Sequence, residues 1–161
     1  MNPYLVMVSR VQCELGEIKK ITERIQLGWE KAQKTSDDLY IDSVALNLHD
    51  FYNGLERLFE FITENIDGMK LSGNRWHQEL LRQMTFALNG IRPAVITLEL
   101  SEKLDEYRSF RHLVRNVYAH QFKPERIRHL IENISIVFKE CERQLSEFCQ
   151  YLRSLDSSPS S

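Results

Sequence analysis

Four basic residues in the last third of the chain recur at a spacing that places them on one side of a helix. At about 100° per residue, Arg108, Arg111, His112 and Arg115 fall within about a quarter turn of one another. Arg binds phosphate oxygens in a bidentate manner and keeps its charge, so this basic face could bind a phosphate. Guanidiniums at this spacing repel one another unless an anion lies opposite them. A solvated face, or one paired with an acidic helix, also fits the spacing, and the charge pattern alone favours that simpler interpretation.

His120 follows Arg115 by five positions in the stretch RNVYAH, and Asn116 and His120 flank the basic face. Imidazole titrates near pH 6.5, so it can accept or donate a proton, whereas a guanidinium keeps its proton and can only stabilise negative charge. An Arg followed by a His at this distance is by itself a weak pattern, because short motifs also arise by chance.

The elements that must position these residues are helices. Apolar residues repeat at intervals of three, four and seven, which indicates amphipathic helices, and six glycines and four prolines are few for 161 residues. The chain should form an all-α fold, an antiparallel up-and-down bundle in one domain over residues 1–155, with a disordered polar tail at 156–161. We expect five helices. The first covers about 3–35, and the second covers about 38–66, with Ser36 or Asp37 as its cap and Gly68 as its stop. The third runs from a cap at Asn74 to Gly90, the fourth from a cap at Ser101 to Tyr118 or His120, and the fifth begins at Pro124.

The composition narrows the class of protein. A hydrophobic fraction of 42% excludes disordered and fibrous chains, and no apolar stretch approaches the roughly 20 residues that cross a bilayer. We expect no signal peptide at the amino terminus and, with three cysteines and no CxxC spacing, a cytoplasmic protein without metal or cofactor. The absence of a glycine-rich phosphate loop argues against a nucleotidyltransferase or a kinase.

The net charge of −2 conceals two oppositely charged segments. Residues 37–67 contain eight carboxylates and one Arg, whereas residues 108–128 contain six Arg or Lys and one Glu. The chain therefore combines an acidic second helix with a basic fourth one.

Four stretches, in order, resemble HepT-like ribonuclease toxins of the HEPN superfamily. FRHLVRNVYAHQF is similar to the signature of that family, in which an Arg, a polar residue and then a His end the penultimate long helix. Arg115, Asn116 and His120 occupy those three positions. WHQELLRQM at 76–84, IRP at 91–93 and LDEYRSFRH at 104–112 follow the order of the family, so the likeness covers most of the chain.

The resemblance implies a metal-independent endoribonuclease toxin that acts as a homodimer and is encoded with an MNT-type nucleotidyltransferase antitoxin. Its substrate would be an RNA such as tRNA or mRNA. Attack of the ribose 2′-hydroxyl on the neighbouring phosphate needs a base, an acid and cations for the developing charge. His120 would transfer protons and Arg115 would stabilise charge. Because one chain supplies one such His, a dimer that brings two copies of the motif into one cleft would explain two proton transfers.

One position departs from the family. Many HepT-like toxins carry, two residues after the His, a Tyr that the antitoxin nucleotidylates, but here this residue is Phe122. A phenyl ring has no hydroxyl to modify. Tyr118 lies within the motif but on the apolar side of the predicted helix. The antitoxin would then block by binding, or modify another hydroxyl, or this branch is silenced differently.

The remaining polar residues have simpler interpretations. We expect Arg108 and Arg111 to give electrostatic support, His112 to be solvated or to touch RNA, and His77, next to Trp76, to cap or pack. The main alternative function is a non-catalytic subunit whose basic helix presents RNA or a nucleotide to a partner nucleotidyltransferase. A histidine phosphotransfer bundle fits less well, because His120 lies at a helix end beside three Arg.

Overall fold

The computed structural model describes the backbone of residues 2–116 and 124–156 and the side chains of residues 2–111 and 124–155. Within these residues the chain forms five α-helices and one short π-helix, and its only β-type pairing is an isolated bridge between Leu88 and Arg92. This confirms the predicted all-α fold. The elements are α1 (Pro3–Thr35), α2 (Asp38–Ile62), η1 (Thr63–Asp67), α3 (Trp76–Gln83), α4 (Leu98–Asn116) and α5 (Pro124–Asp156).

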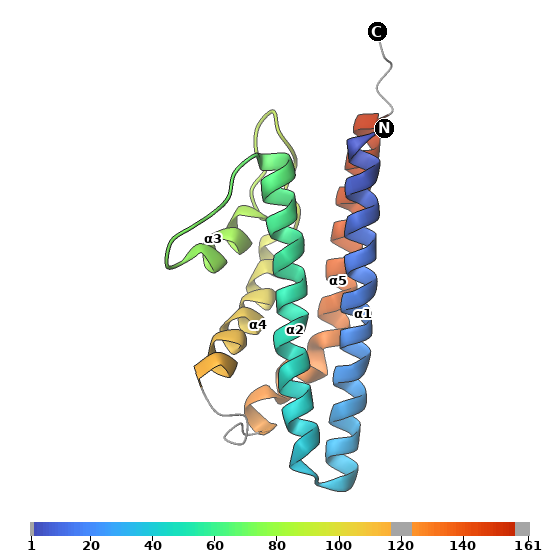
Figure 1. Cartoon of the computed structure of the whole chain (residues 1–161), viewed down its shortest axis with the longest axis vertical. Helices are drawn as coiled ribbons and strands as arrows, with labels where there is room; N and C mark the ends of the chain where they lie inside the picture. Colours follow the sequence, from blue (N-terminus) through green and yellow to red (C-terminus); the bar gives the residue numbers. More distant parts are fainter. Residues whose placement is uncertain (1, 117–123, 157–161) are drawn as a thin grey trace.

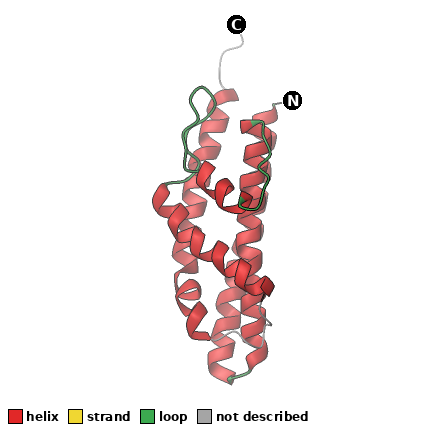
Figure 2. Ribbon diagram, turned by 90° about the vertical axis from the view of Figure 1, so that its left-hand side faces the viewer, coloured by secondary structure: helices red, strands yellow, loops and turns green. Residues whose placement is uncertain are grey.

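Three long helices, α1, α2 and α5, run side by side along the length of the bundle (Figure 1). α1 packs against both α2 and α5, and α4 crosses α2 on the other side and also contacts α5. The short α3 lies against α2 and α4, and the view turned by 90° shows the two long loops that flank it (Figure 2). Successive long helices reverse direction, so the predicted antiparallel up-and-down bundle is confirmed.

The core is built from the apolar stripes that the periodicity predicts. Side chains from α1, α2, α4 and α5 form one cluster that is almost wholly shielded from solvent. Among the largest are Phe51, Phe59 and Tyr107, each with 2% or less of its surface exposed. No helix in the described part of the chain combines the length and apolar character that a membrane crossing demands.

The first interhelical turn and the end of α2 follow the sequence closely. Ser36 takes a left-handed conformation (φ 56°) after α1, and the Asp37 carboxylate caps α2 by accepting from the Leu39 amide at 3.0 Å. The second helix was predicted to reach residue 66, and it continues as the π-helix η1 before Gly68 ends it at φ 74°. The sequence predicted the glycine stop and offered Asp37 as one of two possible caps, but it did not predict the change of helix type.

The third helix is shorter than predicted. α3 ends at Gln83 rather than near Gly90, and Arg75, not Asn74, occupies its N-cap position without a side-chain capping bond. The reason for the early end is the Arg92 guanidinium, which donates to the carbonyls of Gln83 and Phe86 in place of a further helical turn.

The fourth helix begins four residues earlier than predicted, at Leu98. The Thr97 hydroxyl, not that of Ser101, caps α4 by accepting from the Leu100 amide at 3.1 Å. Gln144 of α5 holds the backbone in place here, because its side-chain oxygen accepts a hydrogen bond from the Thr97 amide at 2.8 Å. The Ser101 hydroxyl instead donates to the Leu98 carbonyl inside the helix. The predicted end of this helix at Tyr118 or His120 lies outside the described residues.

The fifth helix begins at Pro124, as predicted, and extends to Asp156. Asp156, the first residue of the predicted tail, is the last residue of this helix, and residues 157–161 lie outside the described part of the chain.

Candidate functional site

The predicted basic face lies on α4, and the structure describes its residues to different degrees. Arg108 and Arg111 are described with their side chains. For His112, Arg115 and Asn116 the structure describes the helical backbone but not the side chains. Tyr118, His120 and Phe122 lie outside the described residues.

Arg108 and Arg111 are mostly covered rather than solvated. Their side chains are only 15% and 17% exposed. The Arg108 Nε donates to Asp105 one turn earlier on the same helix, at 2.7 Å. The Arg111 Nη1 lies 3.8 Å from a carboxylate oxygen of Glu56 on α2. The pairing with the acidic helix, one of the interpretations that the spacing allowed, therefore exists at this point.

Glu56 also holds His77, the second residue of α3. The His77 Nδ1 lies 2.8 Å from the second carboxylate oxygen of Glu56. The Arg111 Nη1 also lies close to this ring, 3.2 Å from Nδ1 and 3.4 Å from Nε2, so the imidazole lies between the Glu56 carboxylate and the guanidinium. The imidazole also packs on the Trp76 ring, with ring centroids 3.7 Å apart. His77 thus packs as expected, but it packs beside the basic face of α4.

The three side chains join three elements that are distant in sequence. Glu56 is almost completely buried, its side chain 7% exposed, and it contacts both Arg111 and His77. The Arg111 Nε is buried and has no hydrogen-bond partner among the described residues. The guanidinium is therefore held in place, but its hydrogen-bonding capacity is not fully used by the described residues.

His77 and Arg111, but not Glu56, line an open pocket of about 600 Å³, here called the cationic pocket. It lies between α4, the start of α3 and the residues just before α3. No carboxylate is among its described lining residues, which are Asn74, Arg75, His77, Gln78, Arg108, Ser109 and Arg111. A pocket of this size and charge suits a phosphate-bearing ligand.

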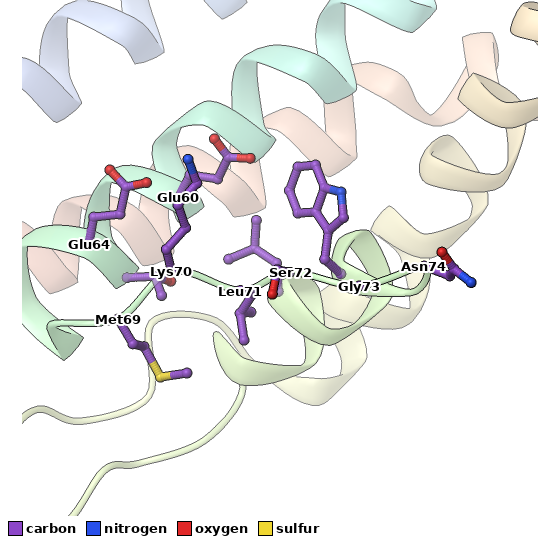
Figure 3. Close-up of a pocket in the computed structure, with 11 residues that line it drawn as sticks. Glu60, Glu64, Met69, Lys70, Leu71, Ser72, Gly73 and Asn74 are labelled. Carbon is purple, nitrogen blue, oxygen red and sulfur yellow. The ribbon is translucent and has the colours of Figure 1, made fainter.

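A second pocket of about 590 Å³, here called the tryptophan pocket, adjoins it and shares Asn74. Its lining includes Glu60 on α2, Glu64 on η1 and, on the loop that passes below them in Figure 3, Lys70 and Leu71. The floor is apolar, with Trp76 and Leu80 from α3. Burial raises the pKa of the Glu60 carboxyl, and the nearby charges of Glu56 and Glu64 raise it further. Two adjacent pockets thus have opposite electrostatic character.

The position of α3 depends on Arg92, for which the sequence reasoning assigned no role. Its guanidinium makes a bidentate pair with Asp67 at the end of η1, through Nε to Oδ1 and through Nη2 to Oδ2 at 2.8 Å. Gln83, the last residue of α3, donates to the same carboxylate at 2.8 Å. Arg92 therefore ties the end of α3 to the end of η1 and, through α3, positions His77.

Sequence reasoning also missed Glu56 and Arg75. Glu56 was one of eight carboxylates in the acidic segment, but it follows Leu55 and precedes Leu58 and Phe59 within an apolar stripe. A charged residue at such a position must find a partner when the helix packs, and that is the signal that could have identified it. Arg75 gave no comparable signal, because it lies in an exposed loop. It lines the pocket because the packing of α3 against α4 brings this loop close to Arg108 and Arg111.

The described residues contain no group of three or more His, Cys, Asp or Glu side chains that could hold a metal ion. Residues 43–152 match the model of a protein family described as HepT-like protein. The matched segment contains α2 to α5 almost completely, and with them Glu56, His77 and the basic face of α4. No curated protein and no solved structure matches the chain.

Proposed function

The chain belongs to the HepT-like family of the HEPN superfamily, and from this membership we propose that it is a metal-independent endoribonuclease toxin of a toxin–antitoxin pair. The observation that carries the proposal is the motif RNVYAH, which begins at Arg115 in the last described turn of α4. The cationic pocket, one to two turns earlier on the same helix, supports a nucleic-acid ligand. We place the protein in the cytoplasm, where such RNA is found.

The proposed reaction follows from the two side chains. One His120 removes the proton from a ribose 2′-hydroxyl, whose oxygen then bonds to the adjacent phosphorus. The bond from phosphorus to the 5′-oxygen breaks, and that oxygen takes a proton from an imidazolium. The products are a 2′,3′-cyclic phosphate and a free 5′-hydroxyl, so atoms and charges balance. Arg115 stabilises the additional negative charge on the phosphorane in the transition state.

A homodimer would supply the two proton-transfer groups. Each chain carries one His120, and two copies of the motif in a shared cleft would provide one base and one acid. An obligate monomer that cleaves RNA at the full rate would contradict this part of the proposal.

The partner that follows from the family is an MNT-type nucleotidyltransferase antitoxin. Because Phe122 has no hydroxyl, nucleotidylation cannot occur at that position. We therefore propose that the antitoxin acts by binding or at another hydroxyl. Mass spectrometry of the toxin after incubation with antitoxin and ATP would distinguish these two possibilities.

Catalysis is tested by incubating tRNA with the wild type and with His120→Ala in the presence of EDTA. We expect cleavage by the wild type and a loss of at least about a hundredfold in His120→Ala, the usual contribution of a general acid or base. His129→Ala is the matched control, because His129 is an exposed imidazole on α5 whose ion-pair partner among the described residues is Glu106, at 3.6 Å. Equal cleavage by wild type and His120→Ala would reject the assignment of His120.

The same assay separates the alternative function. A wild type that binds RNA without cutting it, alone or with the nucleotidyltransferase, would favour the non-catalytic binding subunit. The cationic pocket favours RNA or nucleotide binding both in a nuclease and in a binding subunit. Cleavage, and not binding affinity, therefore distinguishes the two functions.

A further inference from the structure

The cationic pocket contains more positive charge than the described residues around it neutralise. Three guanidiniums line it, and among the described residues two carboxylates contact them, Asp105 at Arg108 and Glu56 at Arg111. Glu56 is shared with His77. The exposed Arg75 side chain makes no hydrogen bond or ion pair with any described residue. The pocket is therefore positive whether or not His77 carries a proton.

The two innermost cations are held in place before any ligand arrives. Arg108 and Arg111 are 15% and 17% exposed, and contacts with Asp105, Glu56 and His77 fix them. Side chains that are ordered in advance lose little conformational entropy when they bind an anion. A chance group of surface Lys or Arg lacks this support, because its long side chains remain free in solution.

The adjoining tryptophan pocket limits where an anion can lie. Glu60 and Glu64 line that pocket together with one described cation, Lys70, so the charge of its described lining is negative and disfavours a phosphate there. Asn74 lines both pockets, and an anion near it is therefore attracted to the cationic pocket, where the guanidiniums lie.

The place of the pocket along α4 connects it with the proposed reaction. Arg108 and Arg111 precede Arg115 by seven and four residues on one uninterrupted helix. At about 1.5 Å per residue, Arg111 is about 6 Å before Arg115 along the helix axis. An RNA strand whose scissile phosphate lies at Arg115 and which follows α4 towards its start would bring a flanking phosphate to the pocket.

We propose that the cationic pocket is a phosphate-binding subsite for the RNA strand next to the cleaved bond, with Arg75, Arg108 and Arg111 as its charged ligands. The inference rests on the proposed function for its substrate class. Glu56 and His77 position Arg111, and Arg75 closes the outer side of the pocket.

The test uses a fluorescein-labelled, fully 2′-O-methylated RNA oligonucleotide, which lacks the attacking hydroxyl and so stays intact. Binding is followed by fluorescence anisotropy at several salt concentrations. We expect Arg75→Ala and Arg108→Ala each to weaken binding roughly tenfold. Each should also reduce the slope of log K against log salt by about 0.7, the value for one phosphate contact on a single strand.

Arg82→Ala is the matched control. Arg82 is an exposed Arg on the same short helix α3, but it packs over Phe86 and lines neither the cationic nor the tryptophan pocket. Its removal should leave affinity and salt slope unchanged. Circular dichroism and urea unfolding of all three variants would show that each is folded.

Two results would overturn the subsite. One is wild-type affinity and salt slope in both Arg75→Ala and Arg108→Ala, and the other is an equal loss in Arg82→Ala, which would reveal only a general charge effect. Binding of AMP more tightly than the oligonucleotide, with the same dependence on Arg75, would overturn the assignment to an RNA strand in favour of a free nucleotide.

The readout is independent of cleavage. Loss of binding in Arg75→Ala together with an inactive wild type would support the subsite and reject the nuclease. Normal binding in Arg75→Ala, together with cleavage that depends on His120, would support the nuclease and reject the subsite.

Discussion

At the scale of single residues, Arg92 and Asp67 form the most buried ion pair among the described residues, with side chains 0% and 1% exposed. The guanidinium also donates to the carbonyls of Gln83, Phe86 and Pro93. A buried pair costs desolvation energy, but each partner then depends on the other. This pair fixes the segment between α3 and α4, and it thereby positions one wall of the cationic pocket.

Arg92→Ala should lower the free energy of unfolding by about 3–5 kcal/mol, because it leaves the Asp67 carboxylate buried without its counter-charge. Arg92→Lys, which keeps a charge but loses the bidentate geometry, should give a smaller loss. Urea unfolding measures both. Arg143→Ala is the control: Arg143 pairs with Glu140 and Glu147 but is 54% exposed, so its loss should be under about 1 kcal/mol. Similar losses in Arg92→Ala and Arg143→Ala would mean that the Arg92 pair is hydrated in solution.

At the scale of elements, α1 and α2 approach each other closely at Gly54. A Cβ atom at this position would lie 2.8 Å from Cγ1 of Ile18, which is itself 1% exposed and has little room to move. Gly16, on the exposed side of α1, has nothing within 4 Å of the corresponding point. The same residue type therefore has opposite roles in neighbouring helices: one glycine permits packing and the other only weakens a helix.

Gly54→Ala should destabilise the protein by about 1–2 kcal/mol, because overpacking against Ile18 outweighs the gain in helix propensity. Gly16→Ala, which makes the same chemical change without a neighbour, should stabilise it by up to about 1 kcal/mol. Urea unfolding measures both effects: the midpoint of Gly54→Ala should lie below that of the wild type, and the midpoint of Gly16→Ala should lie above it. Two variants that are equally stabilised would indicate that α1 and α2 are farther apart than the structure places them.

At the scale of the whole molecule, the bundle covers two of the three cysteines. Cys13 on α1 is exposed, whereas Cys141 and Cys149 on α5 are each 1% exposed. Burial raises the pKa of the Cys141 thiol to about 12 and also raises that of Cys149. Both buried thiols should therefore remain protonated and unreactive while the helices stay packed.

At pH 8 a thiol with a pKa near 12 is ionised to only about one part in ten thousand. We expect DTNB to modify one thiol rapidly in the native protein and all three in denaturant, with the rapid reaction absent in Cys13→Ser. Absorbance of the released thiolate gives the count. A second rapid thiol in the native protein would show that α5 opens locally instead of staying packed along its whole length.

Much of the helical architecture was accessible from the sequence because helical periodicity is a local property. The bounds of α1, the cap at Asp37, the stop at Gly68 and the start of α5 at Pro124 each follow from neighbouring residues. The start of α4 did not, because its cap at Thr97 is chosen by Gln144, which is 47 residues away. Membership of the family was also accessible, because short motifs preserve it. The roles of Arg115 and His120 stay predictions.

The sequence by itself thus determined which segments are helical, which faces are apolar and which residues carry positive charge. Only the tertiary structure decided which charges meet. Glu56 and His77 are 21 residues apart, His77 and Arg111 are 34 apart, and Asp67 and Arg92 are 25 apart. Periodicity specifies the face of each helix but not the rotation and offset at which two helices pack. Those are set by how the side chains interlock across the whole core, and they place a buried carboxylate beneath the basic face of α4.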